Sequence, residues 1–291
     1  MTTLKAENSY TVRSVLAKNP TLDNLIDAVY ALPEDLRPEY WFHLEPRPKS
    51  KRIYLKDKEE FREALQSWGR FGVGSGFMTG KQCGIWFGGF VPQRFLEWRG
   101  YHNHFDVFHK MGEERAEGRI YPQRAFEHFA RYFDSYHAMA MPIRAVEAIE
   151  DARKAVFEKS PPFADYYPDN HTGMVSSYAH AKFRFPMLGW ITYLSDELIT
   201  DYALDIEELR SIAWRFEEVS PTTSAGTLYR AQFWEHRDDW QGNITALTDI
   251  CLRADQYRYR EEEWREEYAF KKLGTVEHWH EWLLPDRWWE R

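Results

Sequence analysis

The stretch KFRFPMLGWITYLSDELI, residues 182–199, must lie in the interior of the folded chain. A continuous run of large apolar side chains is typical of a strand that is buried on both faces. Pro186 and Gly189 interrupt the run, and these residue types mark turns or bulges within strands. We therefore predict a strand, a turn or bulge, and a second strand. In a regular strand Trp190 and Tyr193 would lie on opposite faces, so that one could reach the surface while the other packs in the core.

The remaining elements follow from the spacing of apolar residues and from capping residues, prolines and glycines. Helices are predicted over residues 20–33, 57–69, 121–139, 142–160, 205–218 and 243–274, with Asp57, Asp205 and Asn243 as N-terminal caps and Pro122 in a first turn. Strands are predicted over residues 85–87, 174–185, 189–196 and 225–234, and the glycine-rich segment 69–84 is predicted to be a loop or hairpin. These elements predict an α+β or α/β fold, in which helices flank a mostly antiparallel or mixed central sheet and a long helix lies near the C-terminus.

The chain is long enough for one large domain or two closely packed halves. Its 291 residues are 43% hydrophobic and 17% aromatic, which is ample material for a core. The segment PPFADYYPDN, residues 161–170, has the composition of a connection. We predict a helix-rich N-terminal half, residues 1–160, and an αβ C-terminal half, residues 161–291, packed as one compact unit.

Charge and cysteine content argue against several classes of protein. With 38 Lys and Arg against 46 Asp and Glu, the net charge is −8, which opposes binding to nucleic acid. No segment approaches the roughly 20 apolar residues that cross a bilayer, so we predict no membrane insertion. Cys83 and Cys251 are too few for a disulfide scaffold. We expect reduced thiols in the cytoplasm.

The segment YHNHFDVFH offers the one candidate metal site. On a strand His102, His104 and Asp106 would share a face, with His109 close by. This cluster supports an alternative function, a metal-dependent hydrolase. A plain polar strand explains the same residues, and our main prediction includes no metal, no cofactor and no catalytic residue.

Two quoted segments carry a family resemblance. FRFPMLGWITYLSDEL and the later LRSIAWRFEEVSPTTSAGTLYRAQFWEHRDDWQGNITAL resemble the immunity 52 family of bacterial polymorphic toxin systems. The likeness lies in an apolar strand over residues 189–194, a following helix, and then GTLY with an acidic stretch and another helix. The resemblance implies a cytoplasmic, non-enzymatic protein that binds and silences a cognate toxin. In this family the toxin is often a restriction-endonuclease-like nuclease delivered between competing bacteria.

The composition agrees with such a partner. An acidic chain suits a toxin with a basic site, and the excess of Trp and Tyr suits interface anchors, although aromatic residues more often fill cores. We predict partner contacts at an acidic and aromatic set of residues: Asp238, Asp239, Trp240, Glu261, Glu262, Glu263 and Trp264. A homodimer is left open. A third interpretation is an assembly component that uses the aromatic tail, residues 275–291.

Overall fold

The computed structural model describes residues 10–16, 22–34, 37, 40–43, 52–54, 57–68, 75–79, 83–88, 104–109, 116–133, 135–158, 185–222, 225–236 and 239–260. The strands form two sheets, and every pairing within them is antiparallel. Sheet A has the order β1 (Tyr10–Leu16), β7 (Ser135–Pro142), β8 (Ile191–Ser195), β10 (Leu228–Gln232) and β9 (Arg215–Val219). Sheet B has the order β3 (Arg52–Tyr54), β2 (Tyr40–His43), β4 (Ser75–Thr79), β5 (Cys83–Gly88) and β6 (His104–His109). The fold is therefore α+β, as predicted.

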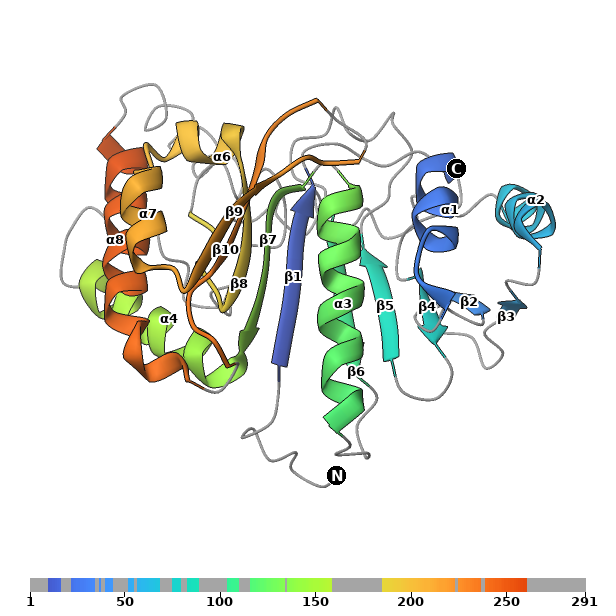
Figure 1. The fold of residues 1–291 in the computed structure, drawn as a ribbon, viewed down its shortest axis with the longest axis horizontal. Helices are drawn as coiled ribbons and strands as arrows, with labels where there is room; N and C mark the ends of the chain where they lie inside the picture. Colours follow the sequence, from blue (N-terminus) through green and yellow to red (C-terminus); the bar gives the residue numbers. More distant parts are fainter. Residues whose placement is uncertain are drawn as a thin grey trace.

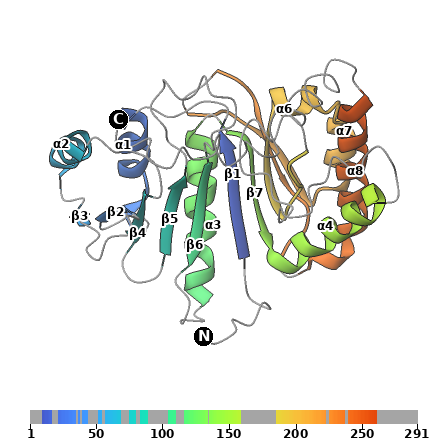
Figure 2. The ribbon, with the colours of Figure 1, turned by 180° about the vertical axis from the view of Figure 1, so that it is seen from behind.

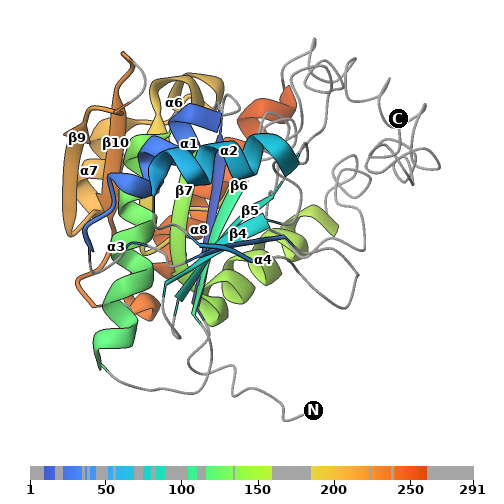
Figure 3. The same ribbon diagram turned by 90° about the vertical axis from the view of Figure 1, so that its right-hand side faces the viewer.

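The two sheets lie side by side, with β1 next to β6 (Figures 1 and 2). The helices are α1 (Leu22–Tyr30), α2 (Lys58–Trp68), α3 (Ala116–Tyr132), α4 (Ile143–Glu158), α6 (Asp196–Asp201), α7 (Ile206–Ile212) and α8 (Ile244–Arg260), with a 3-10 turn η5 (Trp240–Gly242). Figure 3 shows α3 and α4 on opposite sides of the strands, and α8 packs against α4. Within these described segments, no helix has both the length and the apolar character that crossing a membrane requires.

Helix α3 covers one face of sheet A with an aromatic stripe. Phe126, Phe129, Ala130 and Phe133 are all buried there, at the i, i+3, i+4 and i+7 spacing that the sequence predicts for a helix. The same stripe continues into the sheet, because Phe126 and Tyr193 of β8 meet edge to face with ring centroids 5.8 Å apart. Helix and sheet thus share one core.

Sheet A joins the two predicted halves of the chain. Strands β1 and β7 come from residues 1–160, and β7 pairs with β8 from the second half. The first half also contributes all of sheet B, most of which the sequence pattern did not predict as strands. The connection proposed at residues 161–170 lies outside the described residues.

Strand β7 corrects the predicted helix over residues 121–139. The chain is helical from Ala116 to Tyr132 and then forms a strand over Ser135–Pro142, in which every residue is buried. Because both faces of this strand are covered, it shows no alternation of apolar and polar residues. The early helix start also means that Pro122 lies in the interior of α3, not in its first turn.

The apolar stretch is buried over residues 185–194, as predicted, and its second predicted strand is β8, whereas the first predicted strand lies outside the described residues apart from Phe185. Residues 185–189 form no regular structure, and β8 begins after a bend at Trp190. Trp190 and Tyr193 are both buried, at 8% and 0% exposure, so neither reaches the surface. The Trp190 indole Nε1 donates to the carbonyl of Trp234 at 2.8 Å, which satisfies its polar edge inside the core.

Two predicted helix caps are confirmed. The Asp57 carboxylate accepts from the amides of Glu59 and Glu60 at 2.9 and 3.0 Å. The Asp205 carboxylate accepts from two amides of α7 at 2.9 and 3.2 Å. These bonds satisfy amides that have no partner within the helix. At the start of α8 the Asn243 side-chain amide donates to the Phe233 carbonyl, and so ties the helix to the end of β10.

Gly189 sits where a side chain has no room. A Cβ there would lie 3.0 Å from the Ala140 carbonyl oxygen and 3.2 Å from the Met141 Cβ. We expect Gly189→Ala to lower the free energy of unfolding by about 1–3 kcal/mol, the usual cost of overpacking. Gly242→Ala is the control, because nothing lies within 4 Å of a Cβ at that position. Urea unfolding of both variants measures the difference, and equal midpoints would contradict the expectation.

Candidate partner-binding surface

The structure describes two of the seven residues predicted to contact a partner. Asp239 is exposed, and Trp240 is half-buried at η5, where it packs against the core. The other five predicted residues lie outside the described residues: Asp238, Glu261, Glu262, Glu263 and Trp264. Whether the seven residues form one surface therefore stays a prediction, and part of the Trp240 side chain packs in the core.

Three of the four residues of the predicted metal cluster lie in β6. His104, Asp106 and His109 pair with Gly88, Trp86 and Cys83 of β5, and His102 lies outside the described residues. Across the part of the chain that the structure describes, no group of three or more His, Cys, Asp or Glu residues could hold a metal ion. The metal alternative thus gains no support from the described residues.

A different acidic surface is formed by α6, α7 and β9. Residues 196–218, which we call the acidic edge, contain eight Asp and Glu residues against Arg210 and Arg215. Figure 1 places α6, α7 and β9 at the same end of the molecule as α8. Glu197, Glu207 and Glu218 are exposed there. The local excess of negative charge produces a field that attracts a basic partner and repels an acidic one.

Several acids of this surface also hold its own structure in place. Glu207 accepts from Arg210 at 2.7 Å, and Glu208 pairs with Arg253 of α8. The Asp196 carboxylate accepts from the amide of Thr227 at 3.0 Å. Because the two ion pairs are largely exposed, each contributes about 0–1 kcal/mol to stability. The Glu208–Arg253 pair joins α7 to α8, and the Asp196 bond joins the start of α6 to the segment before β10.

Trp214 is the large apolar residue that this surface exposes. It lies between α7 and β9 and is 55% exposed. Among the described residues only Tyr257, at 42%, is another large hydrophobic side chain exposed to this degree. Tryptophan is enriched among the few residues that carry most of the energy at protein interfaces. The exposed Trp214, within an acidic segment, thus has the chemistry of an interface anchor.

A row of residues crosses sheet A and ends in the acidic edge. Ser14, Ala138, Tyr193, Arg230 and Glu217 lie directly opposite one another across the five strands of sheet A. Residues opposite one another share a face, so this row lies on the face that α3 covers. Arg230 is the charged member of the row that is buried, with its side chain only 7% exposed.

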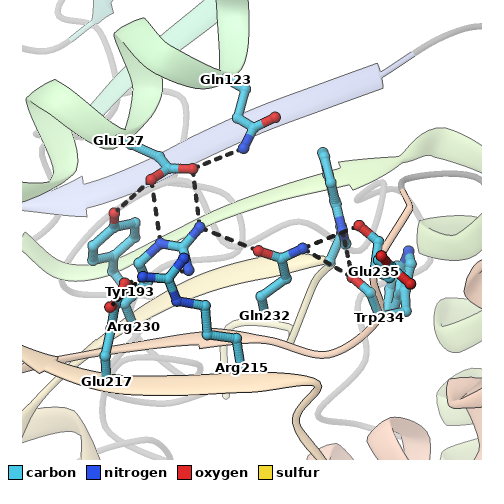
Figure 4. Close-up of polar contacts among 10 residues, drawn as sticks. Gln123, Glu127, Tyr193, Arg215, Glu217, Arg230, Gln232, Trp234 and Glu235 are labelled. Carbon is cyan, nitrogen blue, oxygen red and sulfur yellow. Dashed lines mark hydrogen bonds and ion pairs between the residues drawn. The ribbon is translucent and has the colours of Figure 1, made fainter. Parts of the chain in front are cut away.

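Glu127 of α3 neutralises Arg230. The two form a forked pair, in which Nε donates to Oε2 at 3.2 Å and Nη2 donates to Oε1 at 3.1 Å (Figure 4). Gln123 donates to the same carboxylate at 2.9 Å. A forked arginine–carboxylate pair fixes direction as well as distance. The pair therefore fixes the position of α3 relative to β10.

The network continues to the edge strand. Arg230 Nη1 lies 3.4 Å from Glu217 Oε1, and Glu217 Oε2 accepts from Arg215 at 3.0 Å (Figure 4). Burial, and then the negative charge of Glu127, raise the pKa of the Tyr193 phenol well above its usual value. Tyr193 therefore stays protonated and donates to Glu127 at 3.4 Å. These contacts join β9 to β10 and, through Arg230, to α3.

The sequence pattern missed this surface because it assigned residues 213–218 to a helix. The structure ends α7 at Ile212 and starts β9 at Arg215. No proline or glycine marks the change, and R-F-E-E-V alternates only weakly between polar and apolar residues. The two residues of the Glu127–Arg230 pair are 103 positions apart in the sequence, so no local sequence pattern could have predicted the contact.

Comparisons with known proteins add no relative. No family model matches the chain, and no curated protein matches it. The resemblance to the immunity 52 family accordingly rests on the strand and helix residues quoted under the sequence analysis.

Proposed function

We propose that this chain is an immunity protein that acts in the cytoplasm, where it binds a cognate bacterial toxin and silences it by occlusion. The observation that carries the proposal is the acidic edge, which contains eight acids and the exposed Trp214 and whose strand β9 is tied through Arg230 to Glu127 of α3. The resemblance of the segments around β8 to β10 to the immunity 52 family supports the same function.

The physical logic is complementary charge followed by an apolar anchor. A nuclease toxin needs a basic cleft to hold its phosphate substrate, and an acidic surface is attracted to such a cleft. Complementary potentials accelerate encounter and select the partner. Trp214 then supplies the buried area that keeps the complex together.

Growth rescue tests the proposal. We expect this chain, co-expressed with the toxin encoded immediately upstream of its own gene, to restore growth and to co-purify with the toxin. Absence of both rescue and co-purification would overturn the proposal.

Charge reversal tests the role of the acidic edge. We expect Glu197→Lys, Glu207→Lys and Glu218→Lys in one variant to slow association with that toxin at least about tenfold at low salt, and to flatten its salt dependence. Reversing three exposed acids elsewhere, Glu63, Glu147 and Asp151, changes the net charge equally and is the matched control. Stopped-flow binding measures both rates. Equal slowing in the two variants would show that total charge matters and the acidic edge does not.

A further inference from the structure

Strand β9 is the outer strand of sheet A, and its free side is open in the part of the chain that the structure describes. The strand order ends at β9, which pairs only with β10 within those residues. Figure 3 shows β9 at the outside of the molecule. A strand with one free side presents unpaired N–H and C=O groups, to which an extended chain can add.

The register identifies which residues present those groups. The Phe233 amide donates to the Trp190 carbonyl at 2.9 Å, and the Thr227 carbonyl accepts from Asp196 at 3.4 Å. Phe233 and Thr227 flank β10, so both ends of that strand direct odd-numbered residues toward the β8 side. Alternation along a strand therefore directs the backbone of even-numbered Arg230 toward β9.

Arg230 pairs with Glu217. The backbone of Glu217 is consequently turned toward β10, whereas its neighbours Phe216 and Glu218 direct their N–H and C=O groups to the open side. Two residues of β9 thus offer complete backbone hydrogen-bonding sites to an incoming chain.

The open side lacks two common protections against strand addition. Proteins commonly block edge strands with prolines or bulges, and β9 contains no proline and pairs without a break from Arg215 to Val219. The strand is also preorganised. Phe216 packs on the Tyr229 ring at 5.9 Å, and the Arg210 guanidinium lies 5.3 Å from the Phe216 ring centre. Little ordering is therefore left to occur on binding.

Charge identifies the occupant. A second copy of the chain would bring a second acidic edge, with its own exposed Glu218, against the first, and like charges on neighbouring strands repel. An extended segment rich in Lys and Arg meets these acids favourably and reaches Trp214 at the beginning of the strand. We propose that β9 receives an extended basic segment of the toxin as an added strand, with Trp214 packing on that segment. This inference rests on the proposed function.

One pair of variants isolates the backbone contribution. Glu218→Pro and Glu218→Ala remove the same charge, but only proline removes the outward N–H. We expect Glu218→Pro to bind the upstream-encoded toxin about tenfold to hundredfold more weakly than Glu218→Ala, since a donor is lost and its partner is left unpaired. Trp214→Ala should weaken binding about thirtyfold. Calorimetric titration measures all three.

Hydrogen exchange of the unaltered chain provides a second test that does not depend on the folding of a variant. We expect the amides of Phe216 and Glu218 to exchange quickly in the free protein and slowly in the complex, while that of Glu217 is protected in both. If the toxin binds Glu218→Pro and Glu218→Ala with equal affinity and leaves the amides of Phe216 and Glu218 unprotected, the inference about β9 is overturned while the proposed function stands. Protection that grows with the concentration of free protein would identify a second copy as the occupant. No binding by the unaltered chain would overturn the proposed function as well.

Discussion

Arg153→Met is expected to lower the free energy of unfolding by about 3–5 kcal/mol, because it leaves a buried carboxylate without its cation. Arg153 of α4 and Asp255 of α8 are an ion pair in which both side chains are 0% exposed. Arg153 Nε donates to Asp255 Oδ2 at 3.0 Å, and Nη2 donates to the same oxygen and to the Phe185 carbonyl. The Phe185 amide donates to Asp255 Oδ1 at 2.8 Å. This pair therefore fixes two helices and the start of the apolar stretch.

The matched control is the same substitution at an exposed pair. Arg253→Met removes the cation that pairs with Glu208, where the two side chains are 58% and 36% exposed. Such pairs are worth about 0–1 kcal/mol. Urea unfolding followed by tryptophan fluorescence measures both variants. Similar losses for the two would show that burial of the Arg153 pair has no special effect.

A double variant separates the loss of attraction between Arg153 and Asp255 from the cost of leaving the Asp255 carboxylate buried without its cation. Arg153→Met combined with Asp255→Leu removes both charges and leaves apolar groups of similar bulk. We expect it to be more stable than Arg153→Met alone, because replacing both members of a buried pair is often close to neutral. A double variant less stable than the single one would indicate that the remaining bonds of Asp255 outweigh its unpaired charge.

The sequence predicts helix α3 correctly and misses strand β7, and the difference lies in how many faces each element buries. The apolar positions of α3 recur at 3.6 residues because only one side of that helix meets the sheet, and its stripe from Phe126 to Phe133 was predicted correctly. Strand β7 was assigned to a helix because all of SYHAMAMP is buried. Residues 185–189, which include the predicted turn or bulge at Pro186 and Gly189, form no regular structure.

The composition indicated the chemistry of a partner surface but did not locate the acidic edge. Excess acid and aromatic residues suited to interface anchors were expected, with contacts predicted from Asp238 onward, whereas the structure has acids and the exposed Trp214 within residues 196–218. Their placement depends on the row from Ser14 to Glu217, in which each neighbour comes from a distant part of the sequence. Register of this kind is set by the packing of α3 on sheet A, and no single segment encodes it.

His137 makes the stability of the chain depend on pH. It lies in β7, fully buried, and its Nε2 is 2.8 Å from the Met187 carbonyl oxygen. A carbonyl only accepts, so Nε2 carries the hydrogen and the neutral ring satisfies the bond. Burial, which disfavours the charged form, lowers the pKa of His137 to about 3, although the bond to Met187 acts in the opposite direction. In the unfolded chain the pKa is about 6.5.

Between these two values the unfolded state binds the proton and the folded state does not, so acidification favours unfolding. The stability that neutral His137 provides is complete above about pH 6.5 and falls by about 1.4 kcal/mol per pH unit toward pH 3.

His137→Gln keeps an amide that can donate to Met187 and removes the titration. From pH 7.5 to pH 5 we expect the free energy of unfolding of the unaltered chain to fall by about 2 kcal/mol more than that of His137→Gln. His128→Gln is the comparison: burial lowers the pKa of that half-buried residue as well, and its effect should have the same sign and be smaller. Parallel curves for the unaltered chain and His137→Gln across this range would show that the buried imidazole accepts a proton in the folded state.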